Sequence, residues 1–272
     1  VSVRLRIHRN AAKALLSEGC DVIAQHCDTP NPQLEAESAG KWGVGYNTDM
    51  SKDAPKATLT STLWNWSAYY TYQVKQIVDQ GIQVAIVTGG GNFWRGRTSE
   101  TIDRTKADQI GMLATVMNCI YVSDIFRHVG MKTEVFTPFV CGAFTSLFSK
   151  DAAVEALNEG KVIFFAGGTG HPYFSTDTGA VLRAIEIEAD AMLLAKAIDG
   201  IYDSDPRINP AAKKYDTVSI QEVIDKKLQV VDMTASIMCM ENHMPMYVFG
   251  LNAEDGIVNA VKGTFTGTKV TV

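Results

Sequence analysis

Two glycine-rich turns are the segments of this sequence best suited to bind an anion. VTGGGN at 87–92 follows an apolar stretch, and AGGTGHPYFSTDT at 166–178 follows another. Glycines directly after a buried strand let the backbone approach an anion and turn its N–H groups toward it. Neither turn matches GxxxxGK[ST] or the GxGxxG of a dinucleotide-binding unit, and glycines also end parallel strands for packing reasons alone. The turns predict a phosphate site without fixing its type.

Charged side chains near both turns suit the same chemistry. Arg95 and Arg97 follow the first turn, where a guanidinium can hold two phosphate oxygens; the alternative is a pair of solvated surface arginines. Asp177 ends the second turn at the start of a predicted helix. It either orients a metal or an attacking phosphate there, or acts as a helix N-cap. Asp103 and Asp108, taken by themselves, are typical of a cap and a surface charge.

The elements that must position these residues alternate between strand and helix. Continuous apolar strands are typical of a parallel sheet that is buried on both faces. We expect such strands at 84–88, 133–137, 161–166 and 191–197. Helices are predicted at 109–130, 152–160 and 176–189, and the tail from 220 onward predicts helix, helix, strand, helix and strand. The pattern indicates an α/β fold with a mainly parallel central sheet.

The chain before the first turn lacks this clear alternation. A helix at 11–19, a strand at 21–26, a small strand at 44–46 and a polar loop at 47–56 precede a helix at 69–79. Residues 1–72 hold three of the four tryptophans and balance seven basic against seven acidic residues. The net charge of −5 therefore belongs entirely to the rest of the chain. This shift marks residue 72 as a candidate boundary.

Composition narrows the function classes. With 272 residues, 46% hydrophobic and 20% charged, the chain has the composition of a soluble globular protein of one large or two small domains. The net charge disfavours nonspecific nucleic-acid binding, and no apolar run is long enough to predict a membrane span. The five cysteines are scattered and form no CxxC, so we expect neither a disulfide framework nor a zinc site, and a cytoplasmic location.

A series of longer motifs occurs in one order along the chain: GGGNFWRG (89–96), DRTKADQIGMLATVMN (103–118), GGTGHPYFSTDT (167–178), LRAIEIEADAMLLAKAIDGIYDSDP (182–206), VVDMTA (230–235) and the terminal GTKVTV. Through these motifs the sequence from about Gln73 to Val272 resembles the bacterial uridylate (UMP) kinases of the amino-acid kinase superfamily. The resemblance implies a three-layer α/β/α fold and ATP-dependent phosphorylation of UMP to UDP with Mg²⁺. It also implies a homo-hexamer regulated by GTP and UTP.

The same resemblance implies roles for individual residues. Asp177 would be the catalytic carboxylate, and Arg95 would contact the transferring phosphate and ATP. Gly90 would contact the UMP phosphate and Gly91 that of ATP, while Asp108 would bind the UMP ribose. The uracil and phosphate of UMP would lie against Thr169, Gly170, His171, Pro172, Tyr173, Phe174, Ser175 and Thr176. The adenine nucleotide would lie against Lys196, Tyr202 and Asp205. No metal-ligating residue is predicted.

Residues from about 10 to 72 depart from that family. Uridylate kinases open with a strand carrying Lys-Leu-Ser-Gly-Glu, whose lysine reaches the transferring phosphate; RLRIHRNAAK at 4–13 has basic residues but no Ser-Gly. The segment instead resembles the basic-membrane-protein family of nucleoside-capturing lipoproteins of ABC transporters, through LLSEGCDVIAQHCDTP, VGYNTDMSKDAPKATLTS and WNWSAYY. That family places the loop after GYN in its ligand cleft, which makes Asn47 and Asp49 candidate nucleoside contacts; the alternative is a polar loop without a ligand.

Three interpretations follow for the whole chain. It is a UMP kinase domain (73–272) behind a foreign segment (1–72), a nucleoside-binding module, or a chimeric product without efficient activity. Loss of the lysine loop is expected to impair phosphoryl transfer more than UMP binding. We also expect the strand at 21–26 to replace the lost first strand by pairing with the sheet that contains 84–88.

Overall fold

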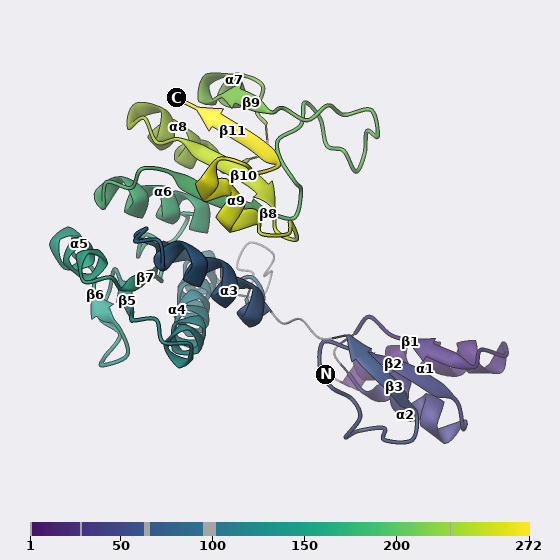
Figure 1. The fold of residues 1–272 in the computed structure, drawn as a ribbon. Helices are drawn as coiled ribbons and strands as arrows, with labels where there is room; N and C mark the ends of the chain where they lie inside the picture. The colour runs from purple at the N-terminus through teal and green to yellow at the C-terminus, as the bar shows by residue number, and fades with distance from the viewer. Residues whose placement is uncertain (1, 28, 63–65, 95–101, 229) are drawn as a thin grey trace. The chain divides into compact units, whose positions relative to one another are not determined.

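The chain forms two compact units. This computed structural model describes residues 2–27, 29–62, 66–94, 102–228 and 230–272. One unit spans Val1–Trp66 and the other Ser67–Val272 (Figure 1). Each unit has its own sheets and its own buried residues. The boundary between a foreign segment (1–72) and a kinase domain (73–272), expected from the two resemblances, stays a prediction.

The first unit is a small α/β layer. Its elements are α1 (Ser2–Ser17), β1 (Val22–Ala24), α2 (Asn31–Ser38), β2 (Trp42–Tyr46) and β3 (Thr58–Thr62). The strands form a parallel sheet in the order β1-β2-β3. Small side chains dominate its core, which contains the cluster Ala12, Ile23, Ala36, Ala54 and Ala57 together with the buried Met50. Burial of so few carbon atoms predicts marginal stability.

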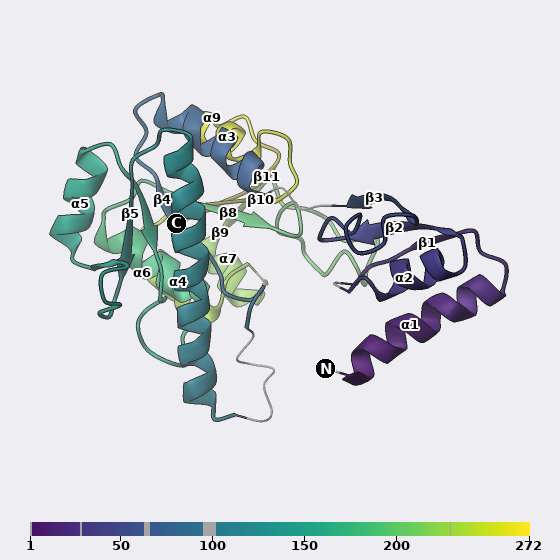
Figure 2. The ribbon, with the colours of Figure 1, turned by 90° about the horizontal axis from the view of Figure 1, so that it is seen from below.

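The second unit begins with a parallel sheet. Its elements are α3 (Trp66–Val78), β4 (Ala85–Val87), α4 (Arg104–His128), β5 (Thr133–Thr137), β6 (Ser146–Leu147), α5 (Lys150–Asn158) and β7 (Val162–Phe165). The strand order is β4-β7-β5-β6 and every pair is parallel. In β7, Val162 and Phe164 pack toward α3 and α4, whereas Ile163 and Phe165 pack toward α5. The sheet therefore lies between two helical layers, as Figure 2 shows for α4 and α5.

A second sheet completes this unit. Its elements are α6 (Thr176–Glu186), β8 (Met192–Lys196), β9 (Thr217–Ser219), α7 (Ile220–Asp225), α8 (Met233–Glu241), β10 (Met246–Gly250), α9 (Gly256–Lys262) and β11 (Gly267–Thr271). The strand order is β8-β10-β11-β9, in which β10 and β11 are antiparallel. Residues of α6, α7 and α8 share one core with this sheet. These sheets confirm the expected α/β fold with mainly parallel strands.

One sequence-based expectation was wrong. Residues 21–26 do not replace the first strand of the kinase sheet, because β1 pairs with β2 in the sheet of the first unit. Within the described residues, β4 has β7 as its one paired neighbour and is an edge strand. An apolar pattern indicates that a segment is a strand, but the partner depends on long-range packing that the pattern does not contain.

The helix α3 is tied to the second unit by a buried amide. Gln73 is 1% exposed; its Nε2 donates to Asp255 Oδ1 over 2.6 Å, and its Oε1 accepts from the backbone N–H of Val258 over 3.2 Å. Asp255 precedes α9 with a positive φ of 50° and gives that helix no side-chain cap. Gln73 therefore takes over part of the N-terminal capping of α9.

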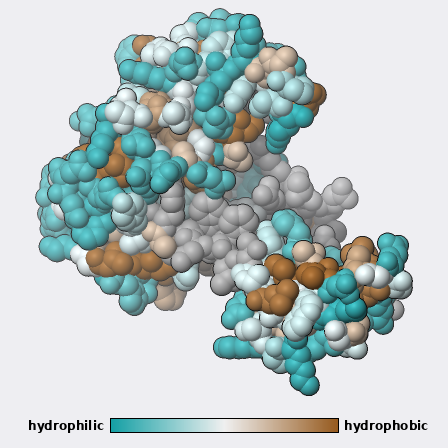
Figure 3. Space-filling model, turned by 45° about the vertical axis from the view of Figure 1, so that its right-hand side comes forward, coloured by the Kyte–Doolittle hydropathy of each residue, from teal (hydrophilic) through white to brown (hydrophobic). Residues whose placement is uncertain are grey.

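Among the described residues, α4 is long and apolar enough by length and composition to cross a membrane. Its Val116, Cys119 and Phe126 are buried against β5 and β7, which is typical of the core helix of a globular protein. On the face seen in Figure 3, hydrophobic residues form small patches among polar ones.

Candidate active site

The two glycine turns meet because their strands are neighbours. β4 and β7 are parallel, with Ala85 opposite Ile163, so both turns leave the same edge of the sheet. One turn of α4 supports both. A Cβ at Gly90 would come within 2.8 Å of the Gly111 carbonyl oxygen and of the Ala114 Cβ, and Thr115 Oγ1 accepts from the Gly167 N–H over 2.7 Å. The two glycine turns therefore lie side by side on α4.

The second turn has a backbone that favours glycine. Gly167, Gly168 and Gly170 have φ values of 79°, 59° and 82°, in the left-handed region. A Cβ at Gly167 or Gly170 would also meet Pro138 or Phe139 at 3.0 Å or less. At Gly168 no atom lies within 4 Å of the Cβ position, so this part of the turn faces open space. Packing and ligand access thus both contribute to the glycine pattern.

Asp108 joins α4 to the second turn. Its Oδ2 accepts from Arg104 Nε over 2.8 Å and from the backbone N–H of Tyr173 over 2.9 Å. The Arg104 guanidinium lies 5.4 Å from the centre of the Tyr173 ring. Tyr173 has a positive φ of 72° and its side chain is exposed. The predicted ribose contact Asp108 and the predicted uracil turn are therefore adjacent.

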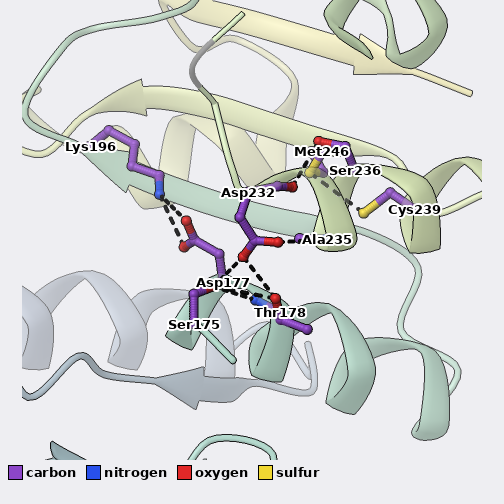
Figure 4. A network of polar contacts seen from close by, with 9 residues as sticks. All are labelled: Ser175, Asp177, Thr178, Lys196, Asp232, Ala235, Ser236, Cys239 and Met246. Carbon is purple, nitrogen blue, oxygen red and sulfur yellow. Dashed lines mark hydrogen bonds and ion pairs between the residues drawn. The ribbon is translucent and has the colours of Figure 1, made fainter. Parts of the chain in front are cut away.

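Asp177 and Lys196 form an ion pair. Lys196 Nζ lies 3.1 Å from Asp177 Oδ1 and 3.3 Å from Oδ2 (Figure 4). Asp177 is in the first turn of α6, at the end of the second glycine turn, and Lys196 is the last residue of β8, so the pair connects this glycine turn to the second sheet. Both side chains are about one third exposed, at 33% and 32%. The structure thus brings together the predicted catalytic carboxylate and a predicted ATP contact.

The N-cap of α6 is Ser175, so Asp177 does not have the capping role that was one of its two alternatives. Ser175 Oγ accepts from the Thr178 N–H over 3.0 Å and donates to Asp232 Oδ2. Asp232 also accepts from Thr178 Oγ1 over 2.8 Å and caps α8 by accepting from the Ala235 N–H over 2.9 Å (Figure 4).

Tyr202 and Asp205 lie in the long loop after β8. The Tyr202 hydroxyl donates to Asp199 Oδ1 over 2.7 Å. Asp205 accepts from the backbone N–H of Arg207 over 2.9 Å, and the Arg207 side chain lowers the pKa of the Asp205 carboxyl. These contacts hold the loop to itself, so they do not bring Tyr202 or Asp205 to the glycine turns.

The other predicted site residues are placed as follows. Thr169 Oγ1 accepts from the His171 N–H over 3.3 Å, and the His171 and Phe174 side chains are exposed. Pro172 and Thr176 are half-buried, and Gly91 is exposed beside Gly90. Arg95 and Arg97 lie outside the described residues. In the first unit, Asp49 accepts from the Ser51 N–H over 2.9 Å and Asn47 has a φ of 67°, which is typical of a polar turn.

These residues fit a bound nucleotide phosphate. No atom lies within 4 Å of the Cβ positions of Gly89 and Gly168, which leaves room for a group on both turns. Mg²⁺ in such sites is bound by one or two carboxylates together with substrate phosphates, and Asp177 is a carboxylate of this kind. No cluster of three metal-ligating residues occurs in the described parts of the chain. Two hollows of about 480 and 420 Å³ lie elsewhere, between α3 and α4 and beside β9 and β11. The candidate site is defined by the polar contacts of Asp108, Asp177 and the two glycine turns.

Comparisons with known proteins identify the second unit. The amino acid kinase family matches residues 68–250, which is more than half of the chain. The chain belongs to the amino acid kinase family. Its structure is similar to UMP kinase from Bacillus anthracis, with a TM-score of 0.73 and 33% identity over 75% of this chain and 86% of that one.

Two further structures agree with this fold. UMP kinase from Ureaplasma parvum has a TM-score of 0.72 and 33% identity over 76% of this chain and 88% of that one. Uridylate kinase from Archaeoglobus fulgidus has a TM-score of 0.60 and 21% identity over 93% of this chain and 100% of that one, a likeness of fold alone. The expected amino-acid kinase fold and the resemblance to UMP kinases are therefore confirmed.

The beginning of the chain matches a second family. The PnrA-like ABC transporter substrate-binding proteins match residues 5–102, which overlap the kinase match from 68 onward. This second match fits a chimeric origin. The overlap contains most of α3 and all of β4.

Sequence reasoning missed two residues that hold the site together. Thr115 supports the second glycine turn from inside α4, and nothing in its surroundings distinguishes it from any other threonine of that helix. Asp232 lies within the motif VVDMTA, but the motif carried no role. An Asp followed by a predicted helix was the one available signal for it.

Proposed function

We propose that this chain is a UMP kinase that transfers the γ-phosphoryl group of ATP to UMP. A phosphate oxygen of UMP forms the new bond to phosphorus while the bond to the ADP oxygen breaks, which yields ADP and UDP. The observation that carries the proposal is the convergence of both glycine turns on one turn of α4, beside the Asp177–Lys196 pair. The identity of 33% to two UMP kinases supports it.

The predicted residues would divide the work of binding and transfer among them. Backbone N–H groups of the two turns would hold phosphate oxygens, with Gly90 and Gly91 on the first turn. Asp108 and the turn from Thr169 to Thr176 would bind UMP, and Arg95 would contact the transferring phosphate. Phosphoryl transfer depends on positioning and charge neutralisation, so these groups need no covalent step. Mg²⁺ would neutralise phosphate charge when bound, with Asp177 orienting it or the attacking phosphate.

Several properties are proposed on the strength of the family alone. Lys196, Tyr202 and Asp205 would lie against the adenine nucleotide. A homo-oligomer, a hexamer in related enzymes, regulation by GTP and UTP, a cytoplasmic location and a place in pyrimidine nucleotide synthesis belong to the same proposal.

The absence of a Lys-Leu-Ser-Gly start predicts impaired turnover. Loss of one preorganised donor to a developing charge lowers turnover by roughly 10²–10³-fold in other enzymes. The test is UMP-dependent ADP release by the whole chain, measured beside a version whose first 72 residues are replaced by a Lys-Leu-Ser-Gly-containing start. We expect slow release from the whole chain and faster release from the replacement. Asp177→Asn should lower both rates.

Two results would count against this account. Equal rates in the two versions would show that the missing loop is dispensable. No UMP-dependent ADP release from either version would exclude the kinase activity.

A nucleoside-binding module is the second candidate, because residues 5–102 match the PnrA-like substrate-binding proteins. His26 lies just after β1 and Tyr46 is the last residue of the neighbouring parallel strand β2. The centres of their rings are 4.2 Å apart. Titration of the whole chain with a nucleoside that lacks phosphate distinguishes the candidates. Binding of uridine as tight as that of UMP would favour the module, whereas the kinase site requires the phosphate.

A further inference from the structure

The motif VVDMTA has no role in the proposed site, yet its Asp232 contacts the substrate turn directly. Asp232 precedes α8, whereas its partners Ser175 and Thr178 begin α6. These helices pack against each other in the same core. A single carboxylate therefore connects the turn that carries Asp177 to a second helix, as Figure 4 shows.

The two oxygens of Asp232 have separate partners. Oδ1 accepts from the Ala235 N–H over 2.9 Å, which caps α8. Oδ2 accepts from Thr178 Oγ1 over 2.8 Å and from Ser175 Oγ. Ser175 Oγ in turn accepts from the Thr178 N–H over 3.0 Å, which caps α6. One carboxylate thus holds the first turns of two helices.

The surroundings favour the ionised form of this carboxylate. Burial alone would raise the pKa of Asp232, but hydrogen bonds from Ser175, the Ala235 N–H and Thr178 outweigh it and lower the pKa. Negative charge is also favourable at a helix N-terminus. Thr178 is only 4% exposed, so water cannot easily replace Asp232 as the acceptor for its hydroxyl.

We propose that Asp232 is a positioning residue that aligns Asp177 and the UMP-binding turn by fixing the first turn of α6. The role rests on the proposed function. Asp177 lies between Ser175 and Thr178 in the chain, so the direction of its carboxylate depends on the same turn. A misplacement of about 1 Å in a phosphoryl-transfer site can lower the rate about 10²-fold.

The test compares variants that distinguish the contacts of Asp232 Oδ2 with α6 from the cap that Oδ1 gives α8. Asp232→Asn keeps the volume and a capping oxygen, since Asn caps helices as well as Asp does. Whichever way the new amide lies, its NH₂ group faces one of the two sets of donors. Thr178→Val removes the partner hydroxyl while keeping its shape. Asp103→Asn is the matched control, because Asp103 caps α4 by accepting from the Lys106 N–H over 3.2 Å.

Two measurements on the whole chain decide the proposal. The first is amide hydrogen exchange over 166–186 without ligand, and the second is the Kd for UMP by calorimetry. Asp232→Asn should speed exchange at 175–181 and weaken UMP binding about tenfold or more, the loss expected for one hydrogen bond to a charged group. Thr178→Val should change both quantities in the same direction. The double variant should lose less UMP affinity than the sum of the two single losses, because both substitutions remove the same hydrogen bond between Thr178 and Asp232. Asp103→Asn should change neither quantity.

The outcomes separate this inference from the function on which it rests. Unchanged exchange at 175–181 in Asp232→Asn would overturn the positioning role, whether or not the chain binds UMP. Faster exchange or a lower melting temperature with a UMP Kd within twofold of the unmodified chain would also overturn it, since a purely structural role predicts that result. Failure of the unmodified chain itself to bind UMP would contradict the proposed function instead.

Discussion

At the scale of the residue, close contact with α4 explains why position 90 of the first turn is glycine. Its Cβ position lies 2.8 Å from both the Gly111 carbonyl oxygen and the Ala114 Cβ, and these atoms belong to a rigid helix. We expect Gly90→Ala to lower the free energy of unfolding by about 1–3 kcal/mol, the usual cost of overpacking. Urea denaturation measures the change. Gly90→Ala should also weaken UMP binding, because the first glycine turn must move to make room for the new methyl group.

The neighbouring glycine provides the control. Gly89 is exposed and no atom lies within 4 Å of its Cβ position. Gly89→Ala should leave the free energy of unfolding within about 0.5 kcal/mol of the unmodified chain. Equal destabilisation by the two substitutions would mean that close contact with α4 is not what requires Gly90.

Residue types were easier to predict than their partners. The motif order marked Asp108 and Asp177 as site residues, but it did not indicate that Asp108 bonds the Tyr173 N–H or that Lys196 pairs with Asp177. Such partners come from different elements. Their distance depends on how helices and strands pack, which short-range sequence patterns do not contain.

At the scale of the element, strands and helices of the second unit were largely predictable. The strand expected at 133–137 is β5, and the helix expected at 109–130 is α4, which begins earlier because Asp103 caps it. Two features of the first unit show the limit of this prediction. The Thr-rich β3 lacks an apolar run, and β1 belongs to a different sheet from the one expected. Both depend on pairing between strands.

The edge of the parallel sheet contains a pH-sensitive contact. Glu134 of β5 accepts from Ser146 Oγ of β6 and from Lys161 Nζ, each over 2.8 Å. Burial alone would raise its pKa, but the hydrogen bonds from Lys161 and Ser146 lower it below the ordinary 4.5. The ionised form therefore stabilises the fold. This stability is fully present above the unfolded-state pKa and is lost as the pH falls through the lower folded-state pKa.

We accordingly expect Glu134→Gln to lower the free energy of unfolding by about 1 kcal/mol at pH 7, as for a partly exposed ion pair. The difference from the unmodified chain should shrink as the pH falls below about 4. Urea denaturation between pH 7 and pH 3.5 measures it. Glu159→Gln removes a more exposed partner of the same lysine, 53% exposed, and should have a smaller effect. A difference that does not vary with pH would contradict the assignment.

At the scale of the whole molecule, the two units have separate cores of unequal size. The described core of the first unit contains four alanines, one isoleucine and one methionine, whereas the second unit has several clusters rich in Val, Ile, Met and Phe. We expect residues 2–62 to unfold at a lower urea concentration than residues 67–272. Hydrogen exchange of peptides from each unit across a urea series measures the two transitions. One coincident transition would contradict independent cores.

The central claim is that the second unit keeps a UMP site although residues 1–272 contain no Lys-Leu-Ser-Gly segment. The predicted UMP contacts from Thr169 to Thr176 are present and described, and Asp108 bonds the turn that contains them. Calorimetric titration of the whole chain with UMP tests this most directly, beside a measurement of ADP release. The account predicts saturable heat on addition of UMP, together with slow turnover. No heat with UMP, alongside a normal rate of ADP release, would contradict it.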